Sequence, residues 1–321
     1  MRIEPLLDQP RLDDRFPLPL DRPFTAATAR AAGVSRFNLG RLIDAGHLRS
    51  PVRGTFLATQ AGDSIRLRAE SLALVVPEDC VVCDRHAGWL HGADMILAPG
   101  EHQQLRPISV FRPSGHGRLR NDLADSGERN LRPRDVTVVG GVLVTTPVRT
   151  TWDLGRQRSR DAALSCMDQM FRLGRVDRDE FLDGIPRFRG MRWVTRLREL
   201  APYVDGRAAS PGESCLRLRW IDAGLPLPEL QVEVWVDGVL LAIIDLACEE
   251  LRYGAEYDGE EWHSTAEQVA HDRARRDELG AQRWLVDVFR RDDVHGRAQS
   301  ADRTLRAGYA AARAARGAVV A

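Results

Sequence analysis

The sequence contains no lysine, and all 46 of its basic residues are arginines. Arginine stays protonated at any physiological pH, so none of these residues can act as a general base. No apolar run approaches the ~20 residues that a membrane-spanning helix needs, and residues 1–24 lack the basic-then-apolar order of a secretion signal. These absences predict a cytoplasmic protein that does not enter a membrane.

Cysteine is also scarce, because the chain has five scattered cysteines and therefore no disulfide framework. Two of them stand in a spacing that a zinc site could use, made of Cys80, Cys83, His86 and His91. If the residues between the two cysteines form a strand, however, the two thiols point to opposite faces of it. We therefore expect core cysteines and packing histidines at these positions.

Charge is balanced overall but divided unevenly along the chain. The net charge is zero, whereas residues 201–321 contain 15 arginines against 21 acidic residues, a net charge of −6, which leaves +6 on residues 1–200. An acidic domain repels polyanions, so the capture of nucleic acid is expected from the basic part. A chain of 321 residues can form two or three domains, each with its own core.

The most informative stretch is an acidic segment in the last third of the chain. An apolar strand is expected to end at Asp245, and residues 254–258 are typical of a second short strand after a turn. Side chains alternate along a strand, so Glu256 and Asp258 share one face. Carboxylates held this close repel one another unless a proton or a divalent cation separates them, and oxygen ligands suit magnesium (Mg²⁺) or manganese (Mn²⁺). The segment therefore predicts a metal site made of Asp245, Glu256 and Asp258.

This arrangement resembles the restriction-endonuclease-like PD-(D/E)xK superfamily and is most similar to its very-short-patch-repair branch. The match consists of Asp245, the acidic-x-Asp-Gly run at residues 256–259, His263, and a D-x-x-R-R-x-x-L helix over residues 272–279. Upstream, residues 210–231 resemble the helix that supplies a further acid, here Glu213. The resemblance covers roughly the last third of the chain.

The resemblance implies a metal-dependent DNA endonuclease. In that mechanism two carboxylates hold the ion, His263 or metal-bound hydroxide supplies the nucleophile, and Arg276 steadies the developing charge. The sequence departs from the superfamily pattern at Asp258, which stands where the superfamily has lysine. The candidate catalytic residues are Asp245, Glu256, Asp258, His263, Arg276 and Glu213.

Two of these residues have a second interpretation. Arg276, four residues after Asp272 on an expected helix, either contacts phosphate or forms a salt bridge that orders the helix. Glu213 is either a metal ligand or an acidic residue that the helix dipole favours near an N-terminus. Both interpretations stay open at this point.

The N-terminal region predicts a helix-turn-helix. Residues 25–32 favour a helix that Gly33 ends, and Ser35 can cap a second helix that runs to residue 45. Residues 48–58 are typical of a two-stranded wing that turns near Arg53. The stretch from residue 25 to residue 60 contains five arginines and one aspartate. Ile43 is expected on the buried stripe of the second helix. The candidate nucleic-acid-binding side chains are Arg36, Asn38, Arg41 and Arg53.

The N-terminal and middle regions resemble AbiEi-type antitoxins. Residues 25–62 are similar to their winged helix, and residues 63–158 are similar to their middle α+β region. In the middle region we expect helices over residues 66–76 and 146–154, and a hairpin over residues 135–145 that turns at Gly140 and Gly141. The resemblance implies DNA as a partner and leaves a toxin partner open. Winged helices also serve as protein-docking scaffolds, which is the alternative for this region.

We therefore expect a multidomain α/β protein with a winged helix-turn-helix, a middle α+β domain and a restriction-endonuclease-like α/β domain. The expected segments are an N-terminal extension (1–24), the winged helix-turn-helix (25–62), the AbiEi-like middle domain (63–158), a helical connector ending in a linker (159–209), the nuclease-like domain (210–305) and a C-terminal tail (306–321).

Two functions from different classes follow from these observations. The first is a Mg²⁺-dependent DNA endonuclease with a DNA-binding winged helix. The alternative is a non-catalytic DNA-binding regulator, an antitoxin-like transcriptional repressor whose nuclease fold is degenerate. The absence of lysine favours the regulator. The carboxylate cluster favours the enzyme, because a pure scaffold has no reason to hold acidic side chains together at an electrostatic cost.

Overall fold

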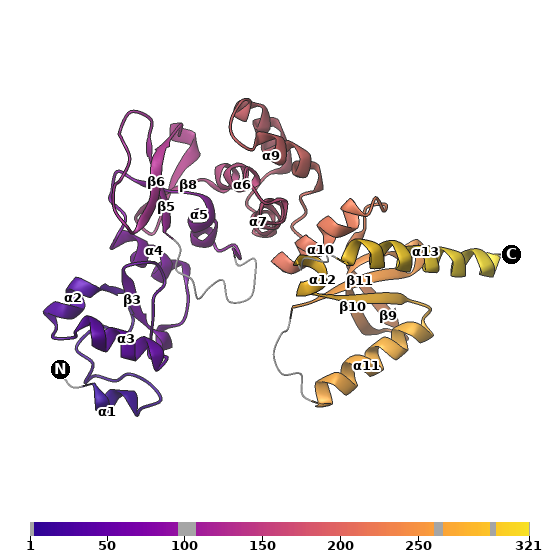
Figure 1. Ribbon diagram of the computed structural model, residues 1–321, viewed down its shortest axis with the longest axis horizontal. Coiled ribbons are helices and arrows are strands. Elements are labelled where there is room, and N and C mark those ends of the chain that lie inside the picture. Colours follow the sequence, from indigo (N-terminus) through magenta and orange to yellow (C-terminus); the bar gives the residue numbers. More distant parts are fainter. Residues whose placement is uncertain (1–2, 96–106, 260–265, 296–299, 321) are drawn as a thin grey trace. The chain divides into compact units, whose positions relative to one another are not determined.

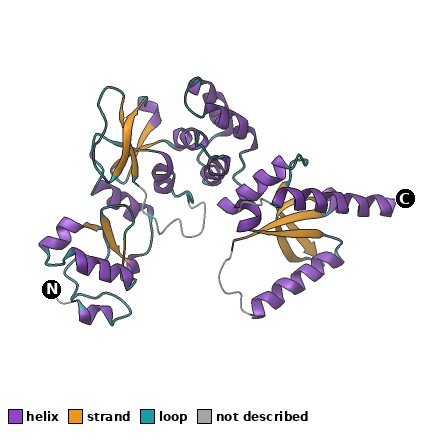
Figure 2. Ribbon diagram, viewed as in Figure 1, coloured by secondary structure: helices purple, strands orange, loops and turns teal. Residues whose placement is uncertain are grey.

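The chain folds into two compact units, Met1–Leu154 and Gly155–Ala321. The computed structural model describes residues 3–95, 107–259, 266–295 and 300–320. Helices and three sheets are distributed along these residues (Figures 1 and 2), so the protein has the mixed α/β, multidomain character that the sequence predicts. Among the described residues, no helix is both long and apolar enough to cross a bilayer.

The first unit begins with a small helical core and a three-stranded antiparallel sheet. Two hydroxyl groups start its helices, because Thr25 Oγ1 accepts a hydrogen bond from Thr28 N and Ser35 Oγ accepts one from Asn38 N, both at 3.2 Å. The sheet order is β1-β3-β2. The elements are α1 (Glu4–Leu7), β1 (Phe24–Thr25), α2 (Ala26–Ala31), α3 (Arg36–Asp44), β2 (Leu48–Arg49) and β3 (Thr55–Ala58).

The N-terminal extension belongs to this core. Its apolar side chains, including Leu6, Leu12 and Phe16, are buried in one cluster with Leu39 and Leu42 of α3. Their burial removes apolar surface from water and fixes residues 3–24 against the helices. The described part of the expected extension, residues 3–24, is therefore a structural part of the first core.

The first unit continues with a mixed five-stranded sheet in the order β6-β5-β4-β8-β7. Its β7–β8 hairpin turns at Gly140 and Gly141, whose φ angles of 55° and 83° suit the tight hairpin turn that we predicted. The elements are α4 (Ile65–Ala73), β4 (Val81–Val82), α5 (Asp84–His91), β5 (Ile108–Pro113), β6 (Ala124–Arg129), β7 (Val136–Val139), β8 (Val142–Thr145) and α6 (Pro147–Gly155).

The second unit holds a four-stranded sheet in the order β12-β11-β10-β9, with helices on both faces. Strands β9, β10 and β11 are antiparallel, and β12 runs parallel to β11. The elements are α7 (Arg160–Arg172), α8 (Arg178–Gly184), α9 (Val194–Leu200), α10 (Pro211–Asp222), β9 (Glu229–Val236), β10 (Val239–Cys248), β11 (Tyr253–Asp258), α11 (Ala266–Ala281), β12 (Leu285–Arg290), α12 (Arg291–His295) and α13 (Ala301–Val320).

Two apolar clusters cover the two faces of this sheet. On one face the fully buried Trp220 of α10 stacks on Tyr253 of β11, with 5.4 Å between ring centroids, and Leu305 of α13 joins the same cluster. On the other face Leu279 of α11 packs against Ile244 of β10. The carboxylates expected at the metal site are therefore held by strands whose positions the core fixes.

The expected linker and tail are both packed. Asp205 N donates a 2.8 Å hydrogen bond to the carboxylate of Asp168 in α7, and Ala208 is 1% exposed. A Cβ on Gly206 would lie 2.7 Å from the α7 backbone, so this segment is seated closely against that helix. The C-terminal residues form the second half of α13, where Ala312 is buried in the core. Neither segment behaves as a loose connection, because each one contributes to the packing of the second unit.

Candidate functional site

Three polar side chains form a row across the second sheet. Leu246 of β10 pairs with Ala255 of β11, which sets Asp245 opposite Glu256. Gln231 lies at the corresponding position on β9, between the pairs that β9 makes with the residues on either side of Asp245. Gln231 has a φ of 55°, a strained value for a residue other than glycine, although β9 keeps its register with β10 on both sides of this residue.

Hydrogen bonds connect this row to the start of α10. Gln231 Nε2 donates to Glu213 Oε2 at 2.9 Å and to Asp245 Oδ1 at 3.4 Å. Tyr257 N donates to Asp245 Oδ2 at 2.8 Å, and Ala209 N donates to Glu213 Oε2 at 2.8 Å. Glu213 therefore satisfies a backbone donor at the helix start, which is the second of the two roles that the sequence left open, and Gln231 links it to Asp245.

The carboxyl groups of Glu213, Asp245 and Glu256 share a buried, negative environment. Burial raises the pKa of each of the three, and the charge of Asp245 raises the pKa of Glu213 and of Glu256 further. Asp245 is thus the electrostatic centre of the group. A group of this kind favours a proton or a cation, and its oxygen donors match hard divalent ions.

One oxygen of the group is left without a hydrogen-bond partner. Glu256 is 9% exposed, and its Oε2 accepts a hydrogen bond from Arg275 Nη2 at 2.9 Å. Its other oxygen, Oε1, is buried and has no hydrogen-bond partner within the described residues. A buried acceptor without a donor is costly, so this atom points to a ligand that the polypeptide does not itself provide.

The group is not a ready-made metal site. Across the described parts of the chain, no three histidine, cysteine or acidic side chains are arranged so that they could hold a metal ion. Gln231 binds both Glu213 and Asp245, and Arg275 holds Glu256. The donor types fit a hard cation, whereas binding one would require these polar contacts to rearrange.

Several expectations for this region need correction. Asp245 lies inside β10 and not at its end, because Leu246, Ala247 and Cys248 continue the pairing with β11. Asp258 has its carboxylate 3.5 Å from Arg290 Nε. It therefore faces a cation of its own on the parallel neighbour β12.

The helix that follows also presents a different arginine. Arg276 is exposed, and the neighbouring Arg275 makes the contact with Glu256. Arg275 lies four residues before the buried Leu279 and shares its stripe, whereas Arg276 is rotated by about 100° around the helix axis. His263 lies outside the described residues. The side chain of Asp272 is likewise outside them.

The N-terminal candidates divide into two groups. Arg36 on α3 and Arg53 between β2 and β3 are exposed. Asn38 is half-buried, and Arg41 Nη1 binds Glu4 Oε1 at 2.9 Å. Two of the four predicted side chains, Arg36 and Arg53, are therefore exposed cations. Ile43 is 38% exposed and does not belong to the buried stripe, which Leu39 and Leu42 form.

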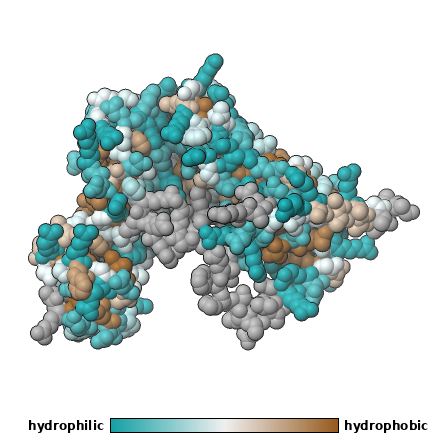
Figure 3. Space-filling model, viewed as in Figure 1, coloured by the Kyte–Doolittle hydropathy of each residue, from teal (hydrophilic) through white to brown (hydrophobic). Residues whose placement is uncertain are grey.

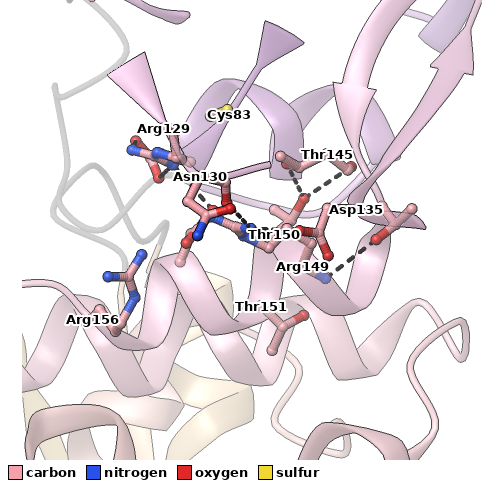
Figure 4. A network of polar contacts seen from close by, with 12 residues as sticks. Cys83, Arg129, Asn130, Asp135, Thr145, Arg149, Thr150, Thr151 and Arg156 are labelled. Carbon is pink, nitrogen blue, oxygen red and sulfur yellow. Dashed lines mark hydrogen bonds and ion pairs between the residues drawn. The ribbon is translucent and has the colours of Figure 1, made fainter. Parts of the chain in front are cut away.

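A buried ion-pair network that the sequence did not indicate lies in the first unit (Figure 4). Arg149 of α6 is 1% exposed, and its guanidinium binds Asp153 at 2.9 Å and Asp135 at 2.8 Å. Arg129 binds Asp153 at 3.0 Å and Asp84 at 2.8 Å. Each carboxylate in this network has an arginine partner, so the network ties α5, β6 and α6 together. The spacing i, i+4 of Arg149 and Asp153 was a signal in the sequence, but their burial was not.

The cysteine and histidine spacing in this unit is a packing feature, as predicted. Cys80 and Cys83 are buried at 1% and 0% exposure. His86 Nδ1 accepts a hydrogen bond from Ser109 N at 3.2 Å, and His91 Nε2 lies 2.7 Å from the Thr145 carbonyl oxygen. Both imidazoles thus bind the backbone.

Comparison with known proteins confirms part of the antitoxin resemblance. Residues 80–203 match the AbiEi antitoxin C-terminal domain family. The match begins inside the predicted middle domain and extends through the helices that we had assigned to a connector. Two relatives from Mycobacterium tuberculosis, the uncharacterized proteins MT2308 and Rv2248, are each 38% identical over 156 residues. This alignment covers 49% of the present chain and 58% of each relative, so the chain spans less than two thirds of the curated relatives it matches.

Proposed function

We propose that this protein is a DNA-binding regulator of the antitoxin type, which binds DNA through its N-terminal unit and represses transcription. The observation that carries the proposal is the AbiEi-type match over residues 80–203, in a chain whose N-terminal part has two consecutive helices, α2 and α3, and a basic charge. A regulator needs an electropositive element that enters a DNA groove and a second module that receives a partner. The order of segments in this chain fits that division, with a toxin as the partner of the second module.

The N-terminal elements support a winged helix. Helices α2 and α3 are joined by a four-residue turn at 32–35, and β2 pairs antiparallel with β3 after α3. In this arrangement α3 is the recognition helix and the β2–β3 connection is the wing. Arg36 at the start of α3 and Arg53 in the wing are exposed, which suits contacts with phosphates and base edges.

A binding experiment tests the proposal. Fluorescence anisotropy would compare the wild-type protein with Arg36→Ala and Arg53→Ala on a duplex taken from upstream of its own coding sequence. We expect each variant to lose about tenfold in affinity and to reduce the salt dependence of binding. Arg15→Ala is the matched control, because Arg15 is exposed in the same unit and is paired with Asp13 at 2.8 Å. Equal affinity of all four proteins, or the absence of binding, would overturn the proposal.

A second candidate function is a Mg²⁺-dependent DNA endonuclease in the second unit, and one observation favours it. Glu256, whose pKa the charge of Asp245 raises, has a buried oxygen, Oε1, with no hydrogen-bond partner among the described residues. The order α10, three antiparallel strands, α11 and a parallel β12 is also the order that a restriction-endonuclease-like core requires. Asp245 and Glu256 would hold the ion, with Glu213 beside them.

The chemistry of this candidate follows from the residues present. A bound Mg²⁺ ion supplies polarisation of a phosphate oxygen and lowers the pKa of a water molecule. Arg275 neutralises one oxygen of Glu256, and its guanidinium is also the nearest described cation that could approach a phosphate. Gln231 orients Glu213 and Asp245 through its amide. With no lysine in the chain, proton removal depends on water or on His263.

A nicking assay separates the two candidates. Supercoiled plasmid would be incubated with the protein in Mg²⁺ or Mn²⁺, and Asp245→Asn would be compared with Asp237→Asn. Asp237 is exposed in the β9–β10 turn with a φ of 51°, a backbone conformation that asparagine tolerates. The nuclease assignment predicts nicking that only Asp245→Asn removes. If the wild-type protein does not nick, or if both variants nick equally, the second unit is not a nuclease.

A further inference from the structure

The outer face of α3 carries an apolar side chain in an unusual position. Phe37 is 73% exposed, the largest exposed fraction among the exposed apolar side chains of the described residues. At about 100° per residue, Phe37 points roughly 170° away from the mean direction of Leu39 and Leu42, the buried stripe of the same helix. Apolar side chains (brown) reach the visible surface of this N-terminal region at the lower left of Figure 3. The ring is available for contact with a partner on this face of α3.

Gly40 lies on the same face, one turn after Phe37. A glycine in the interior of a helix destabilises it by about 1 kcal/mol relative to alanine. A Cβ at Gly40 would meet nothing within 4 Å, so no neighbour inside the protein requires a glycine there. The glycine instead leaves the backbone of α3 open to close approach from outside. This is a second and independent feature that points to the same surface.

The charge around this face indicates which partner it fits. Arg36 precedes Phe37, and the guanidinium of Arg41 lies 5.9 Å from the centroid of the Phe37 ring. Glu4 holds Arg41 at 2.9 Å and thereby fixes its position beside the ring. Asp44, the single acidic residue between residues 25 and 60, lies at the end of α3. Glu4 offsets the charge of Arg41, so Arg36 is the exposed cation of this helix start, which is the end that reads bases in helix-turn-helix proteins.

We infer that Phe37 determines DNA sequence specificity by contacting the 5-methyl group of a thymine in the major groove, with Gly40 allowing α3 to lie close to the base edges. The inference rests on the proposed DNA-binding function and adds a specificity determinant to it. A phenyl ring cannot form hydrogen bonds, and the thymine methyl is the apolar group that a major groove offers. The expected binding site therefore contains at least one thymine whose methyl group contributes to affinity.

The first experiment combines a protein variant with a DNA variant. Duplexes selected by the wild-type protein from a randomised pool would be resynthesised with deoxyuridine in place of each thymine in turn, which removes one methyl group. We expect one position at which deoxyuridine lowers the affinity of the wild-type protein three- to tenfold. A loss of this size corresponds to the burial of about one methyl group. Phe37→Ala should bind the thymine and uracil duplexes equally. Ile43→Ala, on the side of the same helix, should keep the wild-type preference.

The outcomes distinguish this inference from the function it rests on. If selection enriches no sequence, the DNA-binding function itself fails. If a sequence is enriched but Phe37→Ala shows the same methyl preference as the wild type, the inference is wrong and the function stands. If Phe37→Ala leaves DNA binding unchanged and abolishes self-association in sedimentation velocity, a second copy of the chain is the partner of this face, and the inference is also wrong.

A second variant tests Gly40 without a risk of misfolding. Gly40→Ala should raise the melting temperature of the free protein by a few degrees. Alanine favours a helix interior more than glycine does, and its Cβ would have open space around it at this position. The same change should weaken binding to the selected duplex by at least threefold, since the new methyl group separates the helix from the bases. A variant that is more stable and binds as well as the wild type would contradict close approach at Gly40.

Discussion

Asp245 and Glu256 face each other across neighbouring strands, and Gln231 connects Asp245 to the third carboxylate, Glu213. Burial raises the pKa of all three acids. The ionised carboxylates therefore destabilise the fold relative to the protonated carboxyl groups. The free energy of unfolding of suitable variants measures this destabilisation, whether or not the group is catalytic.

The substitution Asp245→Asn should stabilise the metal-free protein. It removes the charge at the centre of the group, and an asparagine oxygen can still accept the hydrogen bond from Tyr257 N. We expect the free energy of unfolding in EDTA at pH 7.5 to rise by about 1 kcal/mol. Urea denaturation followed by circular dichroism measures it, with the exposed Asp237→Asn as the control. A loss of stability in Asp245→Asn would mean that the carboxylate is satisfied by its donors and does not repel its neighbours.

The substitution Arg149→Met should be severe. It leaves Asp135 and Asp153 with buried negative charges and fewer partners, and removal of one member of a buried ion pair costs about 3–5 kcal/mol. Arg66→Ala, which breaks an exposed i,i+4 pair with Glu70, should cost less than about 1 kcal/mol. Chemical denaturation of the two variants gives the comparison directly. Similar losses in both would show that the network in Figure 4 contributes little to the fold.

The substitution Asp168→Asn should change the pH dependence of stability. Burial raises the pKa of Asp168 to about 6, although Arg217 at 2.5 Å acts in the opposite direction. Because the pKa in the fold lies above that in the unfolded chain, this group contributes stability that is fully present below about pH 4 and is lost as the pH rises through 6.

The difference in unfolding free energy between the wild type and Asp168→Asn should therefore be larger at pH 5 than at pH 7.5, by roughly 1 kcal/mol. Parallel urea titrations at the two pH values measure it. A difference that stays the same at the two pH values would show that the ion pair with Arg217 outweighs burial and that the pKa of Asp168 in the fold is not raised.

Local sequence signals predicted the elements of this protein well. Ser35 accepts the capping hydrogen bond that its position predicted, and Gly140 and Gly141 adopt the positive φ angles of the expected hairpin. Alternation along β11 likewise places Glu256 and Asp258 on one side of the strand. These features depend on residues close in sequence, where periodicity and turn chemistry are informative.

Contacts between distant segments were beyond the reach of the same signals. Gln231 joins the acidic group through the pairing of β9 with β10, which sets it opposite Asp245, and Arg275 replaces Arg276 because one step in helix phase decides which arginine faces the sheet. The Ala- and Arg-rich end of the chain is typical of a frayed helix, yet Leu305 and Ala312 pack α13 onto the sheet. In each case tertiary packing, and not local preference, decided the outcome.

The cysteines offer a last test, because their reactivity depends on the packing of both units. Four of the five are buried to 1% exposure or less, and burial raises the pKa of the Cys83 and Cys215 thiols well above its usual range. Cys248, at the end of β10, is partly exposed.

Titration of the native protein with a chromogenic disulfide reagent at pH 8 should therefore detect about one thiol, and the denatured protein should release five. The substitution Cys248→Ser should abolish the reaction of the native protein with the reagent. The slower labelling of the buried thiols, which requires unfolding, should keep its rate. Rapid labelling of two or more thiols in the native protein would contradict the buried positions of Cys80, Cys83, Cys166 and Cys215. It would then also contradict the packing of the cores in which these cysteines lie.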